Sequence, residues 1–334
     1  MNQPFSARRL LFPLVPLYRL ALAFRELRLR SGLEPIRRLR FPVVSIGNLS
    51  TGGSGKTPLT IALAQALAAR GLRVDVLSRG YGRTSKIAAR VNPDGNADDF
   101  GDEPLLIARE TGLLVYVAPR RYEAGLLAEA EAQPISEQNH PPIVHLLDDG
   151  FQHRQLTRNV DILILDSSDW HDTLLPAGNL REPRSAIRRA GVIAIPANEP
   201  ELANELQAWG WQGPIWRLRR ALEIPSVSGP VAAFCGIARP EQFFAGLEAA
   251  GLRLALRSAF PDHHRYTPRD LDRLVAASLA AGATAIITTQ KDHVRLGSLA
   301  SAFPASLPLV AARLHIDFED QTATINWLID YFAS

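Results

Sequence analysis

The chain has 334 residues, of which 46% are hydrophobic and 21% are charged, and its net charge is +3. This composition suits a folded protein of roughly two domains and excludes collagen-like, coiled-coil and wholly disordered chains. The single cysteine, Cys235, excludes an internal disulfide and a cysteine-ligated metal cluster, which favours a reducing compartment. No apolar run reaches the roughly 18 residues that a membrane-spanning helix needs.

Residues 1–40 are predicted to form a basic, amphipathic segment. Prolines interrupt the apolar stretch at 10–18, so a secretory signal is not expected. Apolar residues then recur at helical spacing from Leu17 to Leu27, with arginines around them. Such a helix lies either on an anionic membrane surface or on the protein's own core. The pattern alone favours the core, because most amphipathic helices are packed.

From residue 41 onward, short apolar runs alternate with helical stretches, which is typical of an α/β fold with a mostly parallel sheet. The predicted strands are Phe41–Gly47, Arg73–Ser78, Leu114–Ala118, Ile143–Leu147, Asp161–Leu165, Val192–Ile195, Val231–Cys235, Ala285–Thr289 and Leu309–Ala311. The predicted helices include Pro58–Arg70, Pro104–Thr111, Arg120–Ala132, Arg239–Ala250, Pro268–Ala281 and Thr322–Phe332. Loops are predicted at 92–100, a mobile one, and at 134–142. A turn-rich stretch at 219–229 predicts a boundary between a larger domain at 41–225 and a smaller α/β lobe at 226–334.

A glycine-rich turn between the first of these strands and a helix predicts a phosphate-binding loop. The expected nucleotide-binding residues are Ser50, Thr51, Gly52, Gly53, Ser54, Gly55, Lys56 and Thr57. Backbone N–H groups at the helix start can bind phosphates, Lys56 can reach the β- and γ-phosphates, and the Thr57 hydroxyl can ligate Mg²⁺. The usual pattern has glycine where Ser50 stands, so the loop is a variant. A ligand-free turn is disfavoured, because Lys56 is one of only three lysines in the chain.

Three acidic groups compete to accept a proton in phosphoryl transfer. Asp148 and Asp149 follow an apolar strand, at the sheet edge where α/β proteins bind ligands, and suit a metal-holding role. Asp102 and Glu103 begin a helix, where a capping role and a catalytic role are equally compatible with the pattern. Asp166 ends another strand and is equally typical of a solvated strand end.

Two further loops carry weaker signals. Adjacent histidines, His263 and His264, lie between a predicted strand and a helix and indicate a polar site. Lys291 and Asp292 follow the apolar strand at 285–289, in a position typical of loops that contact nucleotides.

Taken together, the motifs resemble those of the tetraacyldisaccharide 4'-kinases, the lipid A 4'-kinases of Gram-negative bacteria. The matching stretches are SIGNLSTGGSGKTP, SRGYGR, GDEP, LDDGFQHRQL, LLPAGNLREP, FPDHHRYT and TTQKDHVR, in family order from Ser45 to Arg295. The missing loop glycine is itself a trait of that family. The resemblance implies a P-loop NTPase-like, mostly parallel α/β sheet with a second, smaller α/β lobe.

The resemblance also implies transfer of the ATP γ-phosphoryl group to the 4'-hydroxyl of tetraacyldisaccharide 1-phosphate, giving lipid IVA, with ATP and Mg²⁺ as cofactors. The acceptor is a membrane-embedded glycolipid, so the surface-helix interpretation of residues 1–40 becomes the favoured one. The implied location is the cytoplasmic face of the inner membrane, peripherally bound to its anionic surface. Neither a nucleic acid nor an obligate protein partner is expected.

The roles that the resemblance assigns fall on identified positions. Asp102 corresponds to the catalytic aspartate that accepts the hydroxyl proton, and its partner corresponds to His263, with His264 as the alternative; Lys56 is the third catalytic residue. The implied metal site consists of Thr57, Asp148, Asp149 and Glu103. The implied acceptor-binding residues are Asn48, Arg79, Arg120, Arg121, Gln152 and Arg181.

Two other classes share parts of this pattern. A P-loop switch ATPase has the variant loop and the strand-end aspartates, but it needs no proton-accepting carboxylate and no lipid acceptor. A small-molecule ligase resembling dethiobiotin synthetase needs no basic, apolar N-terminal arm. Phosphate transfer to a lipid discriminates among the three.

Overall fold

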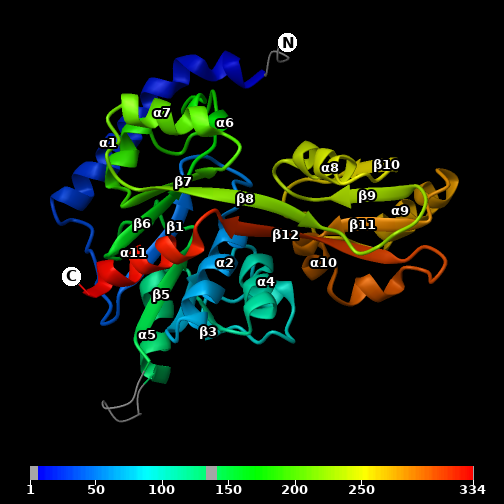
Figure 1. Ribbon diagram of the computed structural model, residues 1–334, viewed down its shortest axis with the longest axis horizontal. Coiled ribbons are helices and arrows are strands. Elements are labelled where there is room, and N and C mark those ends of the chain that lie inside the picture. The colour runs from blue at the N-terminus through cyan, green and yellow to red at the C-terminus, as the bar shows by residue number, and fades with distance from the viewer. Residues whose placement is uncertain (1–6, 133–140, 334) are drawn as a thin grey trace.

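The computed structural model describes residues 7–132 and 141–333, in which the strands join in one twelve-stranded sheet (Figure 1). The strand order is β10-β9-β11-β12-β8-β7-β6-β1-β5-β2-β4-β3. The strands are β1 (Val43–Asn48), β2 (Arg73–Ser78), β3 (Ala89–Arg90), β4 (Leu114–Val117), β5 (Ile143–Asp148), β6 (Val160–Ile164), β7 (Val192–Pro196), β8 (Ile215–Glu223), β9 (Val231–Cys235), β10 (Leu254–Ala259), β11 (Ala285–Thr289) and β12 (Leu309–Phe318).

Helices connect most of these strands and cover the sheet. The α-helices are α1 (Val15–Arg30), α2 (Lys56–Ala69), α3 (Ala97–Phe100), α4 (Asp102–Thr111), α5 (Arg121–Ala132), α6 (Ser167–Trp170), α7 (Pro200–Ala208), α8 (Pro240–Ala249), α9 (Pro268–Ala280), α10 (Gln290–Leu296) and α11 (Gln321–Ala333). The 3-10 helices are η1 (Ala7–Leu14), η2 (Arg184–Arg189) and η3 (Gly297–Ala302). Each strand and helix predicted from the sequence is present, with small shifts at its ends, except that β12 is much longer than predicted.

The larger lobe is built on β1, which pairs in parallel with β5 and β6. Both faces of the sheet in this lobe are buried, which explains why its strands appear in the sequence as unbroken apolar runs. In β5, Val144 and Leu146 pack into the cluster that contains α2, whereas Leu147 packs into the cluster that contains α5. The predicted α/β class with a mostly parallel sheet is therefore confirmed. The parallel arrangement also brings the ends of β1 and β5 to one edge of the sheet, next to the start of α2.

Two long strands join the larger lobe to the smaller one (Figure 1). β8 and β12 pair antiparallel, from Arg313 opposite Glu223 to Phe318 opposite Leu218. β8 therefore occupies the first part of the stretch at 219–229 that the sequence indicated as turn-rich. β12 extends well past its predicted end at Ala311, because its second half pairs with β8. In the smaller lobe, β9 pairs in parallel with β10 and β11.

The last helix returns to the larger lobe. α11 packs beside α2, and its Ile325 and Leu328 belong to the same buried cluster as Leu59 and Leu63 of α2. The predicted smaller lobe extended from 226 to 334, whereas residues 321–333 lie with the larger lobe. The sequence did not predict that α11 packs on the larger lobe, because the apolar pattern of a helix does not reveal which surface the helix covers.

The N-terminal helix exposes the apolar residues that the sequence placed on one face. Leu17, Leu20, Phe24 and Leu27 of α1 are between 61% and 66% exposed, while Val15 and Leu29 are buried against the protein. The alternative that this face packs on the protein's own core is therefore wrong for these four side chains. Among the described residues, no helix combines the length and the hydropathy that crossing a membrane requires.

The two predicted loops have different outcomes. Residues 92–100 include the short helix α3, whose N-cap Asn96 accepts a hydrogen bond from the Asp99 N–H. Most of the loop predicted at 134–142 lies outside the described residues.

Candidate active site

The glycine-rich loop after β1 leads into α2 with its backbone N–H groups free of side-chain caps. Gly52 and Gly55 have φ values of +100° and +91°, which L side chains rarely adopt. A Cβ atom at Gly52 would also lie only 2.9 Å from the Cβ of Ala238 in the smaller lobe. The loop therefore needs glycine for its conformation and for its contact with the second lobe. Its uncapped N–H groups lie at the positive end of a 14-residue helix, an arrangement suited to binding an anion.

Lys56, the first residue of α2, is held between a neutral and a charged partner. Its Nζ donates a hydrogen bond to Asn48 Oδ1 at 3.1 Å and lies 3.7 Å from Asp149 Oδ1. Arg181 donates to both carboxylate oxygens of Asp149, at 2.9 and 3.2 Å. Burial alone would raise the pKa of Asp149, but Lys56 and Arg181 outweigh it and hold that pKa well below its usual range.

Asp148, the last residue of β5, differs sharply from its neighbour. It is buried, and Thr60 of α2 donates a hydrogen bond to its Oδ1 at 3.1 Å. Burial and the nearby carboxylates of Glu103 and Asp149 raise the pKa of Asp148 to about 7. Like charges thus crowd together where a divalent cation would relieve the repulsion.

The donor set at this point fits Mg²⁺. The hydroxyl of Thr57 and the carboxylates of Glu103, Asp148 and Asp149 are oxygen ligands, which Mg²⁺ prefers. Within residues 7–132 and 141–333, no group of three or more histidine, cysteine or acidic side chains is arranged to hold a metal by itself. Mg²⁺ is usually bound through one or two carboxylates together with substrate phosphates and water, so such a closed cage is not required.

Asp102, at the start of α4, is bound by two basic side chains of the smaller lobe. His263 Nδ1 lies 3.1 Å from its Oδ2, and Arg295 Nε donates to the same oxygen at 2.6 Å. Burial opposes ionisation, but the hydrogen bond from His263 and the charge of Arg295 hold the pKa of Asp102 far below its usual range. In return, that hydrogen bond raises the pKa of His263. The alternative, His264, contacts Asp270 at 3.2 Å instead.

Glu103 is likewise paired across the two lobes. Lys291 of α10 donates a hydrogen bond to Glu103 Oε1. Burial works against ionisation of Glu103, but Lys291 outweighs it and lowers the pKa of that carboxyl. Lys291, which gave only a weak signal in the sequence, therefore lies in the site. Its partner Glu103 directly follows Asp102, the carboxylate that Arg295 binds.

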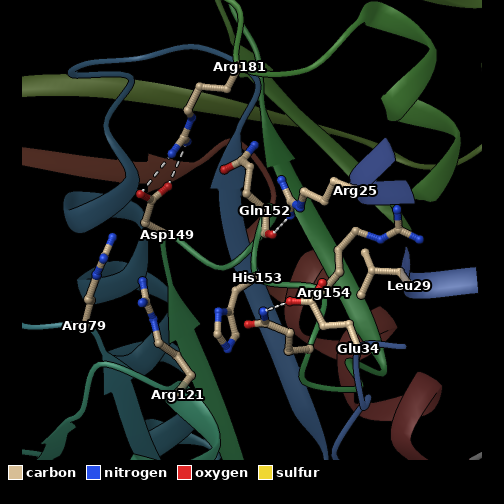
Figure 2. Close-up of a pocket in the computed structure, with 11 residues that line it drawn as sticks. Arg25, Leu29, Glu34, Arg79, Arg121, Asp149, Gln152, His153, Arg154 and Arg181 are labelled. Carbon is tan, nitrogen blue, oxygen red and sulfur yellow. Dashed lines mark hydrogen bonds and ion pairs between the residues drawn. The ribbon is translucent and has the colours of Figure 1, made fainter. Parts of the chain in front are cut away.

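A basic cavity of about 260 Å³ opens beside Asp149 (Figure 2). Its lining includes the predicted acceptor residues Arg79, Arg121, Gln152 and Arg181. The predicted Asn48 is buried at the edge of this region, where it accepts a hydrogen bond from Arg181. Burial lowers the pKa of Arg121 only to about 10, so this side chain stays charged at neutral pH.

Arg120 is the predicted acceptor residue that the structure does not bring to the cavity. Its side chain is 81% exposed and lies 3.7 Å from Glu123, one turn along the chain. The next residue, Arg121, is the first residue of α5, and its side chain lines the cavity instead (Figure 2).

Sequence reasoning missed several residues of this region. Arg25, His153 and Arg154 also line the cavity, and burial together with neighbouring arginines lowers the pKa of His153 to about 4. The stretch that includes His153 and Arg154 was among the family motifs, which was a usable signal. Arg25 carried no such signal, because it looked like one of many arginines on an amphipathic helix.

Comparisons with known proteins agree with this geometry. The family model for tetraacyldisaccharide-1-P 4'-kinase matches residues 7–333. A tetraacyldisaccharide 4'-kinase of Koribacter versatilis is 40% identical over 328 residues, covering 95% of this chain and 97% of that protein. Another from Anaeromyxobacter dehalogenans is 41% identical over 306 residues, covering 84% and 79%.

A solved structure also matches along nearly the whole chain. The crystal structure of the "apo" form of LpxK from Aquifex aeolicus in complex with ATP gives a TM-score of 0.72 at 32% identity, covering 98% of this chain and 100% of that one. The matches in sequence and in structure span both lobes and the site between them. This chain belongs to the tetraacyldisaccharide 4'-kinase family.

Proposed function

We propose that the chain transfers the γ-phosphoryl group of ATP to the 4'-hydroxyl of tetraacyldisaccharide 1-phosphate, forming lipid IVA in lipid A biosynthesis. The observation that carries this proposal is the meeting of three features at one edge of the sheet. The phosphate-binding loop with Lys56, the buried carboxylate of Asp102 and the basic cavity next to Asp149 lie around the ends of β1 and β5. A nucleotide, an acceptor hydroxyl and a phosphorylated sugar would each find a matching group of residues there.

The residues divide the reaction between them. Lys56 and the loop N–H groups bind the β- and γ-phosphates and stabilise the charge on the transferring group. The 4'-oxygen forms a bond to the γ-phosphorus, the bond to the bridging oxygen of ADP breaks, and the hydroxyl proton passes to Asp102. His263 and Arg295 orient that carboxylate through its Oδ2. A weak base suffices, because the acceptor loses its proton late in a loose transition state.

Mg²⁺ would be held by Thr57 and by the carboxylates of Asp148, Asp149 and Glu103. When bound, it would neutralise charge on the β- and γ-phosphate oxygens. The raised pKa of Asp148 supports this role, since a cation would favour its ionised form.

The basic cavity would hold the phosphorylated sugar of the acceptor. Arg79 and Arg121 extend into it from two different elements, and Gln152 adds an amide (Figure 2). Guanidinium groups suit this task because they bind phosphate through two parallel hydrogen bonds. Arg181 belongs to both sites, because it lines the cavity and also pairs with Asp149.

The test is the fate of a labelled γ-phosphate. Purified full-length chain is incubated with labelled ATP, Mg²⁺ and tetraacyldisaccharide 1-phosphate in detergent micelles, and lipids are separated from free phosphate. Label in a lipid that carries one more phosphate than the acceptor is the expected result. Label in free phosphate alone, at the same rate with and without the lipid, would support a switch ATPase instead.

We further propose that α1 docks the enzyme on the cytoplasmic face of the inner membrane as a peripheral protein. The exposed side chains of Leu17, Leu20, Phe24 and Leu27 support this, because they form an apolar surface on a helix rich in arginine. Docking by this surface would bring the basic cavity close to the headgroups, since Arg25 and Leu29 of the same helix line that cavity.

Replacing Leu20 and Phe24 together with serine should lower the partition onto anionic vesicles by about tenfold or more, because both apolar side chains would no longer be buried in the bilayer. The measurement is co-sedimentation with vesicles that contain an anionic lipid. Leu279→Ser is the matched control, since Leu279 lies on α9 of the smaller lobe and is 53% exposed. Undiminished binding of the double variant would contradict docking through α1.

A further inference from the structure

We propose that Arg239 and Ser50 are positioning residues that couple docking of the smaller lobe to the orientation of Lys56. They are linked through a chain of hydrogen bonds, named here the inter-lobe relay, that consists of Arg239, Asp169, Ser50, Asn48 and Lys56. This inference rests on the proposed function, because Lys56 is the residue whose position is controlled.

The relay begins with Arg239, which precedes α8 in the smaller lobe. Its guanidinium donates to Asp166 Oδ2 at 2.8 Å and to Asp169 Oδ1 at 2.6 Å, and both acceptors belong to the larger lobe. The two carboxylates are nearly buried, with 9% and 2% of their side chains exposed. Two charge-assisted hydrogen bonds to buried acceptors form a strong and directional contact between the lobes.

The relay continues from Asp169 into the phosphate-binding loop. Ser50 Oγ donates to Asp169 Oδ2 at 2.8 Å, and Asn48 Nδ2 donates to Ser50 Oγ at 2.9 Å. Ser50 and Asn48 are fully buried. The Ser50 hydroxyl donates its single proton to Asp169 and accepts from Asn48 through a lone pair, so one hydroxyl links the two side chains.

The order of donors fixes the side chain of Asn48. Because its Nδ2 donates to Ser50, its Oδ1 faces Lys56 and accepts the hydrogen bond from Nζ at 3.1 Å. Arg181 also donates to this Oδ1, so the oxygen is held by two cations, while Ser50 accepts from the Nδ2 end of the amide. If the hydroxyl of Ser50 were absent, the Nδ2 end would lose its side-chain partner, and Lys56 and Arg181 would compete for a less firmly held oxygen. To the extent that Asn48 shifts away from Lys56, the other side-chain contact of Lys56 in the described part of the chain is Asp149, at 3.7 Å.

The relay explains why the loop departs from the usual pattern. Glycine at position 50 would satisfy the backbone but would carry no hydroxyl, so the link between Asp169 and Asn48 would be broken. The smaller lobe also touches the loop directly, through Ala238 beside Gly52. Arg239 is the next residue after Ala238, so the contact of the smaller lobe with the loop and the hydrogen bonds of Arg239 form together.

The experiment is a double-mutant cycle on kcat in the full-length enzyme, with Arg239→Gln, Ser50→Ala and both together. Each single variant should lower kcat by about tenfold, as expected for the loss of one hydrogen bond to a charged group, with a smaller change in the KM for ATP. The double variant should be no slower than the slower single variant, because either change alone breaks the relay.

Controls separate this inference from the function itself. Arg257→Gln is matched to Arg239→Gln, because Arg257 pairs with Glu248 within the smaller lobe, and it should leave kcat unchanged. Thermal unfolding shows whether each variant folds. If Arg239→Gln does not fold, the kcat of Ser50→Ala alone decides. Multiplicative losses in the double variant, or a normal kcat for Ser50→Ala, would overturn the relay. Absence of lipid phosphorylation by the unaltered chain would instead count against the proposed function.

Discussion

Alanine in place of Asp102 is expected to lower kcat for lipid phosphorylation by about 10²- to 10⁴-fold, with the Kd for ATP nearly unchanged. The carboxylate is buried at the start of α4 and is oriented by His263 and Arg295. In the proposed mechanism it takes the proton of the acceptor hydroxyl and does not contribute to ATP binding. Steady-state transfer and calorimetric titration with ATP measure the two quantities separately.

The alanine variant also leaves Arg295 without one of its carboxylate partners, which costs stability. Asp102→Asn is therefore the better variant, because it keeps the shape and can still accept hydrogen bonds, but it cannot take up the proton. It should be as slow as the alanine variant. Asp94→Ala is the matched control, since Asp94 is exposed in the loop before α3. A near-normal rate for Asp102→Asn would move the proton-accepting role to Asp149 or Asp148.

Replacing Lys56 with alanine should lower kcat by at least about 10²- to 10³-fold, because positive charge is removed from the transferring phosphoryl group. The side chain is only 14% exposed and is held by Asn48 and Asp149, so its charge is already oriented before the nucleotide binds. Lys56→Arg should also be slow, since a planar guanidinium differs in shape from a compact ammonium.

Lys86→Ala is the control for this lysine effect. Lys86 is exposed and lies in a surface loop after β2, so its removal should leave the rate unchanged. A rate for Lys56→Ala within a few-fold of the unaltered enzyme would contradict the assignment of the glycine-rich loop as the triphosphate site.

Much of the fold and part of the site could be predicted from local sequence patterns. Asp148 could be placed at a strand end because apolar runs give the strands, and parallel strands end at one edge. Lys56 could be placed at the start of a helix because glycines precede it in a recognisable order. In both cases the signal lies within a few residues of the side chain concerned.

Contacts between distant segments could not be predicted in this way. Arg295 binds Asp102 from 193 positions along the chain, and Arg239 binds Asp169 from 70 positions away. No periodicity encodes such pairs, since they depend on how the two lobes meet. The same limit explains the final helix, whose apolar face suits several surfaces but packs beside α2. It also explains Ser50, whose role depends on the distant Asp169.

The most direct test is a crystal structure of the full-length chain with a non-hydrolysable ATP analogue and Mg²⁺. The account predicts the triphosphate within the loop at 50–57, with Lys56 Nζ at hydrogen-bond distance from β- and γ-phosphate oxygens and the Asp102 carboxylate facing the γ-phosphorus. A nucleotide bound elsewhere, or an Asp102 carboxylate turned away from the γ-phosphate, would contradict it.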